Sequence, residues 1–217
     1  MRTMFRKAGV ACGTLVASAA LAVTTATGAW GANTALVVGG LSTPSLHDLI
    51  MAQLLGGDLQ GQERVSINWP AEAGPYTGYG DLTLGQSINV GINNLNTGID
   101  TALGQLANGE KVTVVGLSAG SLVVNEVLRL MAADANAPDA EDITFILVAD
   151  SSRQKLIKDS KYNARYDYTY QPAPETEYHI KVITGEYDGM ADLPDRWWNF
   201  TALLNAIAGG IFVHVPM

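Results

Sequence analysis

The sequence predicts an α/β fold, in which a doubly wound, mostly parallel sheet carries helices on both faces. Short apolar runs rich in β-branched residues alternate along the chain with amphipathic stretches, the order expected when each strand is followed by a helix. The runs are almost continuously apolar, which is typical of strands buried on both faces of a parallel sheet.

Length and composition fit a single domain with a substantial core. The chain has 217 residues, of which 47% are hydrophobic and 16% charged, so disorder is not the default expectation. There are 13 Lys and Arg against 21 Asp and Glu. Removing the three basic residues within 1–31 would leave 10 against 21, a net charge of −11. This acidity makes nucleic acid an unexpected partner.

The first 31 residues have the layout of a secretory signal peptide. Arg2, Arg6 and Lys7 precede an apolar run over residues 8–23, and the small residues Ala29 and Gly31 follow. We therefore expect residues 1–31 to be a signal peptide and residues 32–217 the domain, in a protein that is secreted or associated with the cell envelope.

The alternative for this segment is an uncleaved membrane anchor, but the run is shorter than the roughly 20 apolar residues that span a bilayer. Cleavage would also remove Cys12, which is the only cysteine. The mature chain would then have neither a disulfide nor a thiol nucleophile.

Five strands and four helices are expected after this segment. The longest helix is indicated by apolar residues at spacings of three and four from Ile88 to Leu106, and Asn108-Gly109 ends it. Pro44 suits the first position of an earlier helix. The expected strands are Thr34 to Val38, Val65 to Trp69, Val112 to Gly116, Ile143 to Ala149 and His179 to Thr184, and the other helices cover 43–55, 118–134 and 197–208.

Two segments interrupt the alternation of strands and helices. Residues 70–85 are rich in Gly, Pro and Tyr and predict a long loop after the second strand. Residues 151–178 are polar and contain several tyrosines. The second segment is either a flap over the site or an exposed ribbon with solvated tyrosines.

A nucleophilic serine is indicated by Gly116-Leu117-Ser118-Ala119-Gly120. This pentapeptide matches the nucleophile elbow of α/β-hydrolases, in which a strained turn from strand to helix exposes the serine and small neighbours allow tight packing. It follows the strand ending near Gly116 and opens the helix over 118–134, as the motif requires. We therefore predict an α/β-hydrolase-type sheet with Ser118 as nucleophile.

A serine hydroxyl needs a base, normally a histidine that a carboxylate orients. The chain has three histidines, and the order serine, acid, histidine excludes His47, which precedes Ser118. His214 follows the last expected helix, where this fold places the base. His179, within an apolar strand, is the alternative.

The carboxylate of the triad is expected just beyond the strand that ends at Thr184. Asp188 lies there, in a turn from Gly185 to Gly189. The alternatives left open are Asp192, Asp195 and, at the end of the preceding strand, Asp150.

Acyl transfer also needs N–H donors for the developing oxyanion. We expect them at Ala119 and in the turn Gly39-Gly40-Leu41-Ser42, where Leu41 and Ser42 are the candidates. No metal and no cofactor are expected: Asp188, Asp192 and Asp195 lack the alternate spacing of a calcium loop, and no phosphate-binding loop with its lysine is present.

The chain resembles the PE-PPE domain family of mycobacteria and their relatives, serine hydrolases of cutinase-like α/β-hydrolase fold. The resemblance covers most of residues 32–217 and implies a triad of Ser118, Asp188 and His214 without a cofactor. It rests on Gly39-Gly40, on Gly116 to Ser121, on Gly185-Glu186-Tyr187-Asp188-Gly189-Met190-Ala191-Asp192-Leu193-Pro194-Asp195, and on Val213-His214.

The function that this resemblance implies is a secreted serine esterase, lipase or acyltransferase. Its partner would be an acyl ester or a lipid, including trehalose-type lipids of the cell envelope, with peripheral association with that envelope. The alternatives are a catalytically silent lipid-binding or envelope-interaction module of the same fold, and a peptidase that uses the same triad.

Overall fold

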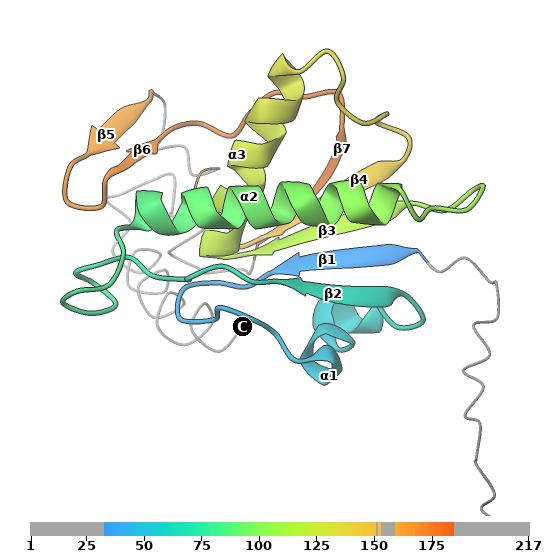
Figure 1. Cartoon of the computed structure of the whole chain (residues 1–217), viewed down its shortest axis with the longest axis horizontal. Coiled ribbons are helices and arrows are strands. Elements are labelled where there is room, and N and C mark those ends of the chain that lie inside the picture. The colour runs from blue at the N-terminus through green and yellow to red at the C-terminus, as the bar shows by residue number, and fades with distance from the viewer. Residues whose placement is uncertain (1–32, 151, 153–158, 185–217) are drawn as a thin grey trace, which may run out of the picture. The chain divides into compact units, whose positions relative to one another are not determined.

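A sheet of five parallel strands, in the order β2-β1-β3-β4-β7, forms the centre of the fold (Figure 1). The computed structural model describes residues 33–150, 152 and 159–184, which all belong to the unit Gly31–Met217. The strand order reverses between β1 and β3, so the sheet is doubly wound, as the sequence predicted. The strands are β1 (Thr34–Val38), β2 (Glu63–Ile67), β3 (Val112–Leu117), β4 (Ile143–Val148) and β7 (His179–Ile183).

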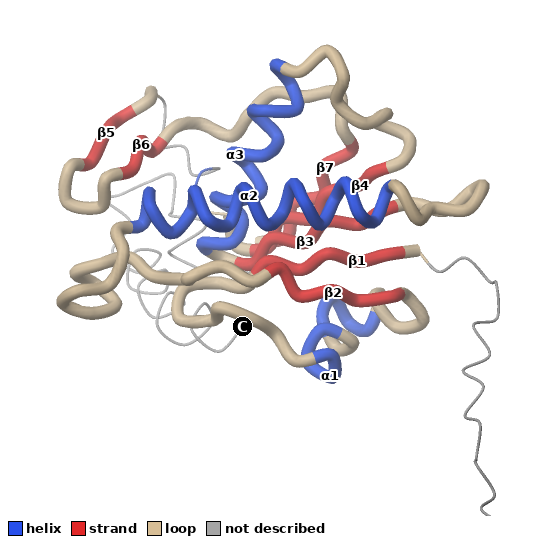
Figure 2. Tube along the Cα trace, in the orientation of Figure 1, coloured by secondary structure: helices blue, strands red, loops and turns tan. Residues whose placement is uncertain are grey.

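Helices cover both faces of the sheet, as Figure 2 shows. The helices α2 (Leu84–Leu103) and α3 (Ala119–Ala133) pack on one face. The short helix α1 (Asp48–Met51) and the 3₁₀ turn η1 (Leu54–Gly57) lie on the other. None of the helices among the described residues is long and apolar enough to cross a membrane.

The start of α2 is fixed by a capping box that the sequence analysis did not identify. The Thr83 hydroxyl accepts a hydrogen bond from the Gln86 N–H, and the Gln86 side chain accepts one from the Thr83 N–H. Two backbone donors at the helix start are therefore satisfied reciprocally, so α2 begins four residues before Ile88, the first residue of the predicted pattern.

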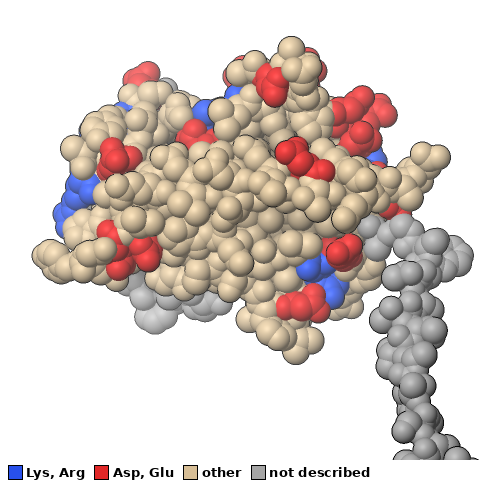
Figure 3. Space-filling view, viewed as in Figure 1, with Lys and Arg blue, Asp and Glu red and all other residues tan. Residues whose placement is uncertain are grey.

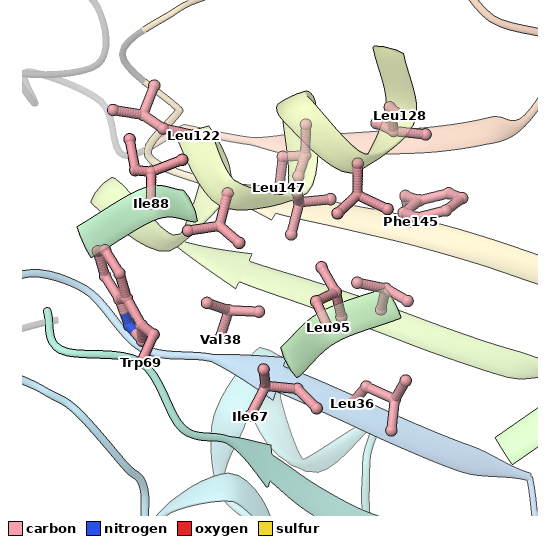
Figure 4. Packing of buried hydrophobic residues seen from close by; sticks show 14 of the residues in the cluster. Leu36, Val38, Ile67, Trp69, Ile88, Leu95, Leu122, Leu128, Phe145 and Leu147 are labelled. Atoms are coloured by element: carbon pink, nitrogen blue, oxygen red, sulfur yellow. The ribbon is translucent and has the colours of Figure 1, made fainter. Parts of the chain in front are cut away.

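The core lies on both sides of β1, whose residues alternate between the two faces. Leu36 and Val38 pack under α2 and α3, whereas Ala35 and Val37 face α1. All four are at most 1% exposed, which explains the continuous apolar run. Figure 4 shows the larger cluster, in which side chains from the sheet, the loop after β2, α2 and α3 meet, among them Trp69, Ile88, Leu95, Leu122, Phe145 and Leu147.

The predicted helix over 43–55 is wrong, because only α1 and η1 form there. The first part of the segment instead pairs with the chain at and after β2. The Trp69 N–H donates to the Pro44 carbonyl over 3.2 Å, and the Leu46 N–H donates to the Ser66 hydroxyl over 2.8 Å. These bonds hold the backbone extended, so helix formation starts only after them.

The polar segment 151–178 contains an antiparallel hairpin of β5 (Lys161–Asn163) and β6 (Tyr168–Tyr170). It is neither a free flap nor a fully solvated ribbon: Tyr168 is buried against the core, whereas Tyr162 is 58% exposed. The predicted signal peptide over 1–31 and the predicted helix over 197–208 lie outside the described residues.

We expect Leu95→Ala to destabilise the protein by about 2–5 kcal/mol. Leu95 is 0% exposed in the cluster between α2 and the sheet, so its removal leaves a cavity. The matched control is Asn89→Ala on the exposed side of α2, which should change stability by less than about 0.5 kcal/mol. Urea unfolding monitored by circular dichroism measures both, and equal effects would contradict the assignment of this core.

Candidate active site

Ser118 forms a sharp turn between β3, which ends at Leu117, and α3, which begins at Ala119. Its backbone has φ 50° and ψ −118°, a combination that costs a residue with a side chain about 1–3 kcal/mol. The Ser118 N–H donates to the Val148 carbonyl over 2.8 Å, which ties the turn to the end of β4. This is the strand-to-helix geometry that the motif predicts.

The two glycines of the motif lie where a side chain would not fit. A Cβ atom on Gly116 would be 2.8 Å from the Ser121 Cα, and one on Gly120 would be 2.5 Å from the Val38 and Gly39 carbonyl oxygens. The first turn of α3 therefore packs directly against β3 and against the end of β1. The Ser121 hydroxyl strengthens this packing by donating to the Gly116 carbonyl over 2.8 Å.

The turn after β1 lies beside Ser118. A Cβ atom on Gly40 would be 3.3 Å from the Ser118 Cβ and 3.8 Å from its Oγ. Because glycine has no side chain, the backbone of the turn lies directly beside the nucleophile. The turn is held by the indole N–H of Trp69, which donates to the Gly39 carbonyl over 3.0 Å. Ligands of doubly wound sheets bind at this position, outside the carboxyl ends of the strands where the order reverses.

The candidate oxyanion donors flank this contact. Ala119 is the first residue of α3, so its N–H lies at the positive end of the helix dipole, and the first turn carries no acidic residue to offset it. Leu41 and Ser42 lie in the facing turn. The Ser42 N–H is already used, because it donates to the Ala71 carbonyl over 2.8 Å. Ser42 is exposed, so its hydroxyl is the group that it can offer to a ligand as a hydrogen-bond donor.

Asp150, the alternative acid, lies in a buried cluster behind the site. It is 1% exposed, and its Oδ1 accepts from both the N–H and the hydroxyl of Ser152, over 3.0 and 2.8 Å. Its Oδ2 accepts from the Asn125 amide over 2.9 Å. Both carboxylate oxygens thus bond to neighbouring protein groups that hold the chain after β4 against α3.

Asn125 was not among the predicted residues of the site, although it is fully buried on α3. Its amide donates to Asp150 and to the Ser152 hydroxyl, over 2.9 and 2.8 Å. The available signal was its position within the largely apolar run from Leu122 to Leu128, one turn after the buried Ser121. A polar residue at that spacing requires a buried partner, which is this cluster.

Neither histidine among the described residues lies near Ser118. His47 caps α1, where its Nδ1 accepts from the Leu49 N–H over 3.3 Å. His179 begins β7 and is level with Thr113 of β3, five residues before Ser118, or about 16 Å along the sheet. The alternative base His179 is therefore not supported. His214, Asp188, Asp192 and Asp195 lie outside the described residues.

The β5–β6 hairpin is anchored beside the site rather than free to swing. The Gly85 N–H at the start of α2 donates to the Tyr166 carbonyl over 3.0 Å. The Tyr168 hydroxyl donates to Glu126 of α3 over 2.9 Å. Burial, followed by the nearby Glu126 carboxylate, raises the pKa of Tyr168 well above its usual range, so this phenol stays protonated.

The described part of the chain contains no group of three or more His, Cys, Asp or Glu side chains that could hold a metal ion. What it brings together is a strained serine, a helix start and a glycine turn. This arrangement suits covalent attack on a carbonyl group whose oxygen is held by backbone donors.

We expect Ser118→Gly to be more stable than Ser118→Ala by about 1 kcal/mol. Both variants lose the hydroxyl, but only glycine relieves the strained backbone, and part of this gain is offset by its greater freedom in the unfolded chain. Urea unfolding of the two variants measures the difference. Equal stability, or a more stable alanine variant, would show that the turn is unstrained.

Solved structures support the fold. Lysin B of mycobacteriophage D29 superimposes with a TM-score of 0.53 and 16% identity, over 82% of this chain and 73% of lysin B. An acetylxylan esterase superimposes with a TM-score of 0.52 and 15% identity, over 83% of this chain and 94% of the esterase. At this identity the likeness concerns the fold alone, a mostly parallel sheet of α/β-hydrolase type.

The related sequences come from Mycobacterium tuberculosis. The chain is 36% identical to an uncharacterised PPE family protein, PPE63, over 68% of its length. It is 33% identical to the SL1278 acyltransferase Chp1 over 68%, and 31% identical to the esterase PE16 over 91%. A Diacyltrehalose acyltransferase, Chp2, is 28% identical over 69% of the chain.

These relatives are longer proteins. The chain aligns with 31% of PPE63, 36% of Chp1 and 40% of PE16. The family model of the PE-PPE domain matches residues 60–217, which include the serine motif, most of the sheet and the segment after β7. The chain therefore belongs to the PE-PPE domain family.

Proposed function

We propose that this protein is a serine esterase, lipase or acyltransferase that acts on acyl esters, including trehalose-type lipids of the cell envelope. The strained backbone of Ser118, held beside the Gly40 turn at the start of α3, is the observation that carries the proposal. Strained backbone of this kind is concentrated at active sites and ligand-binding sites. The relatives named esterase and acyltransferase support the same chemistry.

In the proposed reaction, His214 takes the proton of the Ser118 hydroxyl while the oxygen attacks the acyl carbonyl, and Asp188 orients the imidazole. The Ala119 N–H, with Leu41 and Ser42 in the facing turn, binds the oxyanion. Collapse of the tetrahedral intermediate breaks the ester bond, and His214 donates its proton to the leaving alcohol. Water or a sugar hydroxyl then takes the acyl group from Ser118.

Chain order and the match to the family model support Asp188 over Asp150 as the acid. Both oxygens of Asp150 accept hydrogen bonds from Ser152 and Asn125. Asp150 fits a structural role, in which it holds the chain after β4 against α3. Asp188 follows β7, the next strand along the sheet, in the segment matched by the family model.

We expect Ser118→Ala and His214→Ala to lower kcat on p-nitrophenyl esters by roughly 10³-fold or more, because each removes a triad member. Asp188→Asn should lower kcat strongly, whereas the matched control Asp192→Asn should keep it. Asp150→Asn should mainly lower stability, since it disturbs a buried hydrogen-bond cluster. Steady-state kinetics and urea unfolding separate these effects.

A fluorophosphonate probe distinguishes this proposal from a silent lipid-binding module. Covalent labelling at Ser118 that His214→Ala abolishes supports the enzyme. A folded protein that takes no label, and turns over no ester of any chain length, would instead be the module. Preference for a matched amide over the ester would reassign the chain to the peptidases.

We also propose that residues 1–31 direct secretion. The expected outcome of expressing the chain in an exporting actinobacterial host is an extracellular product that lacks about 30 residues, measured by intact mass and N-terminal sequencing. Leu15→Arg, which places a charge in the apolar run, should retain the protein in the cells. Gln105→Arg, on the domain surface, is the control and should not. A full-length product on the cell membrane would indicate an anchor.

A further inference from the structure

The loop between β2 and α2 presents two tyrosines to solvent. Tyr76 is 74% exposed and Tyr79 is 99% exposed, and Leu82 beside them is 39% exposed. The base of the same loop is buried, with Ala71 and Ala73 at most 3% exposed. The loop thus combines a buried base with a tip that exposes two aromatic rings.

Hydrogen bonds hold the loop in one shape. At its neck the Gly74 N–H donates to the Leu82 carbonyl over 2.8 Å, and the Leu82 N–H donates to the Glu72 carboxylate over 2.7 Å. Nearer the tip, the Tyr76 N–H donates to the Ala73 carbonyl over 2.8 Å. Because the tip is already ordered, docking it onto a surface costs little conformational entropy.

This loop lies at the same edge of the sheet as Ser118. It leaves the carboxyl end of β2, and its Ala71 carbonyl accepts from the Ser42 N–H in the turn that flanks the nucleophile. Figure 1 shows the loop and the β5–β6 hairpin at the same end of the sheet. A surface that contacts the tyrosine tip therefore also approaches the candidate site.

The shape and charge of the tip indicate which partner it fits. Tyr79 is almost fully exposed, so the described residues around it do not form the wall that a pocket for a single soluble molecule requires. Tyrosine, with an apolar ring and a polar hydroxyl, favours the boundary between lipid and water. Among residues 70–83 the charged ones are Glu72 and Asp81, both acidic, which disfavours an anionic surface.

On the face of the molecule that Figure 3 shows, over α2, acidic and basic atoms form small separate groups among uncharged residues. We propose that Tyr76 and Tyr79 dock the protein onto an uncharged lipid surface and so bring the Ser118 edge to its acyl lipid. This inference rests on the proposed function for its purpose, but the docking itself requires no catalysis.

The first test places an environment-sensitive fluorophore at the tip, in Tyr79→Cys on a Cys12→Ser background. Phosphatidylcholine vesicles should shift its emission to the blue, and added salt should not reverse the shift. The matched control is Leu130→Cys, which is also exposed but lies about 18 Å along α3 from Ser118, and its emission should not shift. No shift at position 79, or a shift with dissolved trehalose alone, would overturn the proposal.

The second test uses the double variant Tyr76→Ser/Tyr79→Ser of the full chain. Hydrolysis of an ester embedded in phosphatidylcholine vesicles should fall roughly tenfold or more, because two rings no longer bury apolar area. Hydrolysis of a short, dissolved ester should stay unchanged. If the double variant loses activity equally on both substrates, or loses activity on neither, docking is contradicted. If vesicles shift the emission at position 79 but the protein hydrolyses no ester, only the proposed function is contradicted.

Discussion

The first turn of α3 lies directly against the end of β1, and the rest of the site depends on this contact. Gly120 allows it, because any side chain there would collide with the Val38 and Gly39 carbonyl oxygens. With α3 this close, Gly40 lies beside Ser118, and the chain passes from β3 into α3 through a residue with strained backbone. The buried sheet provides the stability that offsets this strain.

The parallel sheet was predictable because its strands are buried on both faces and appear in the sequence as unbroken apolar runs. The prediction failed where long-range bonds decide the local structure. Pro44 suits a helix start, but bonds to the chain around β2 hold that segment extended. The β5–β6 hairpin was not predicted as strands, since its tyrosines pack against distant helices and show no apolar run.

The residues of the candidate site were likewise predictable only where their requirements are local. Ser118 and the facing turn could be located because their demands are local: small residues at fixed spacing between a strand and a helix. The partner of Asn125 could not be located, because Asp150 follows 25 residues later and only the packing of α3 on β4 brings them together. The assignments of Asp188 and His214 rest on chain order and family resemblance, since both lie outside the described residues.

The direction of β1 determines how the protein can be attached to other molecules. Its first residues pair with the start of β3, where the Lys111 N–H donates to Asn33 and the Thr34 N–H donates to Lys111. This is the amino edge of the sheet, opposite Ser118. A fusion partner or an affinity tag joined before Asn33 is therefore attached at the amino edge of the sheet. The same holds for a tether to a solid support, and the carboxyl edge with Ser118 stays accessible to substrate.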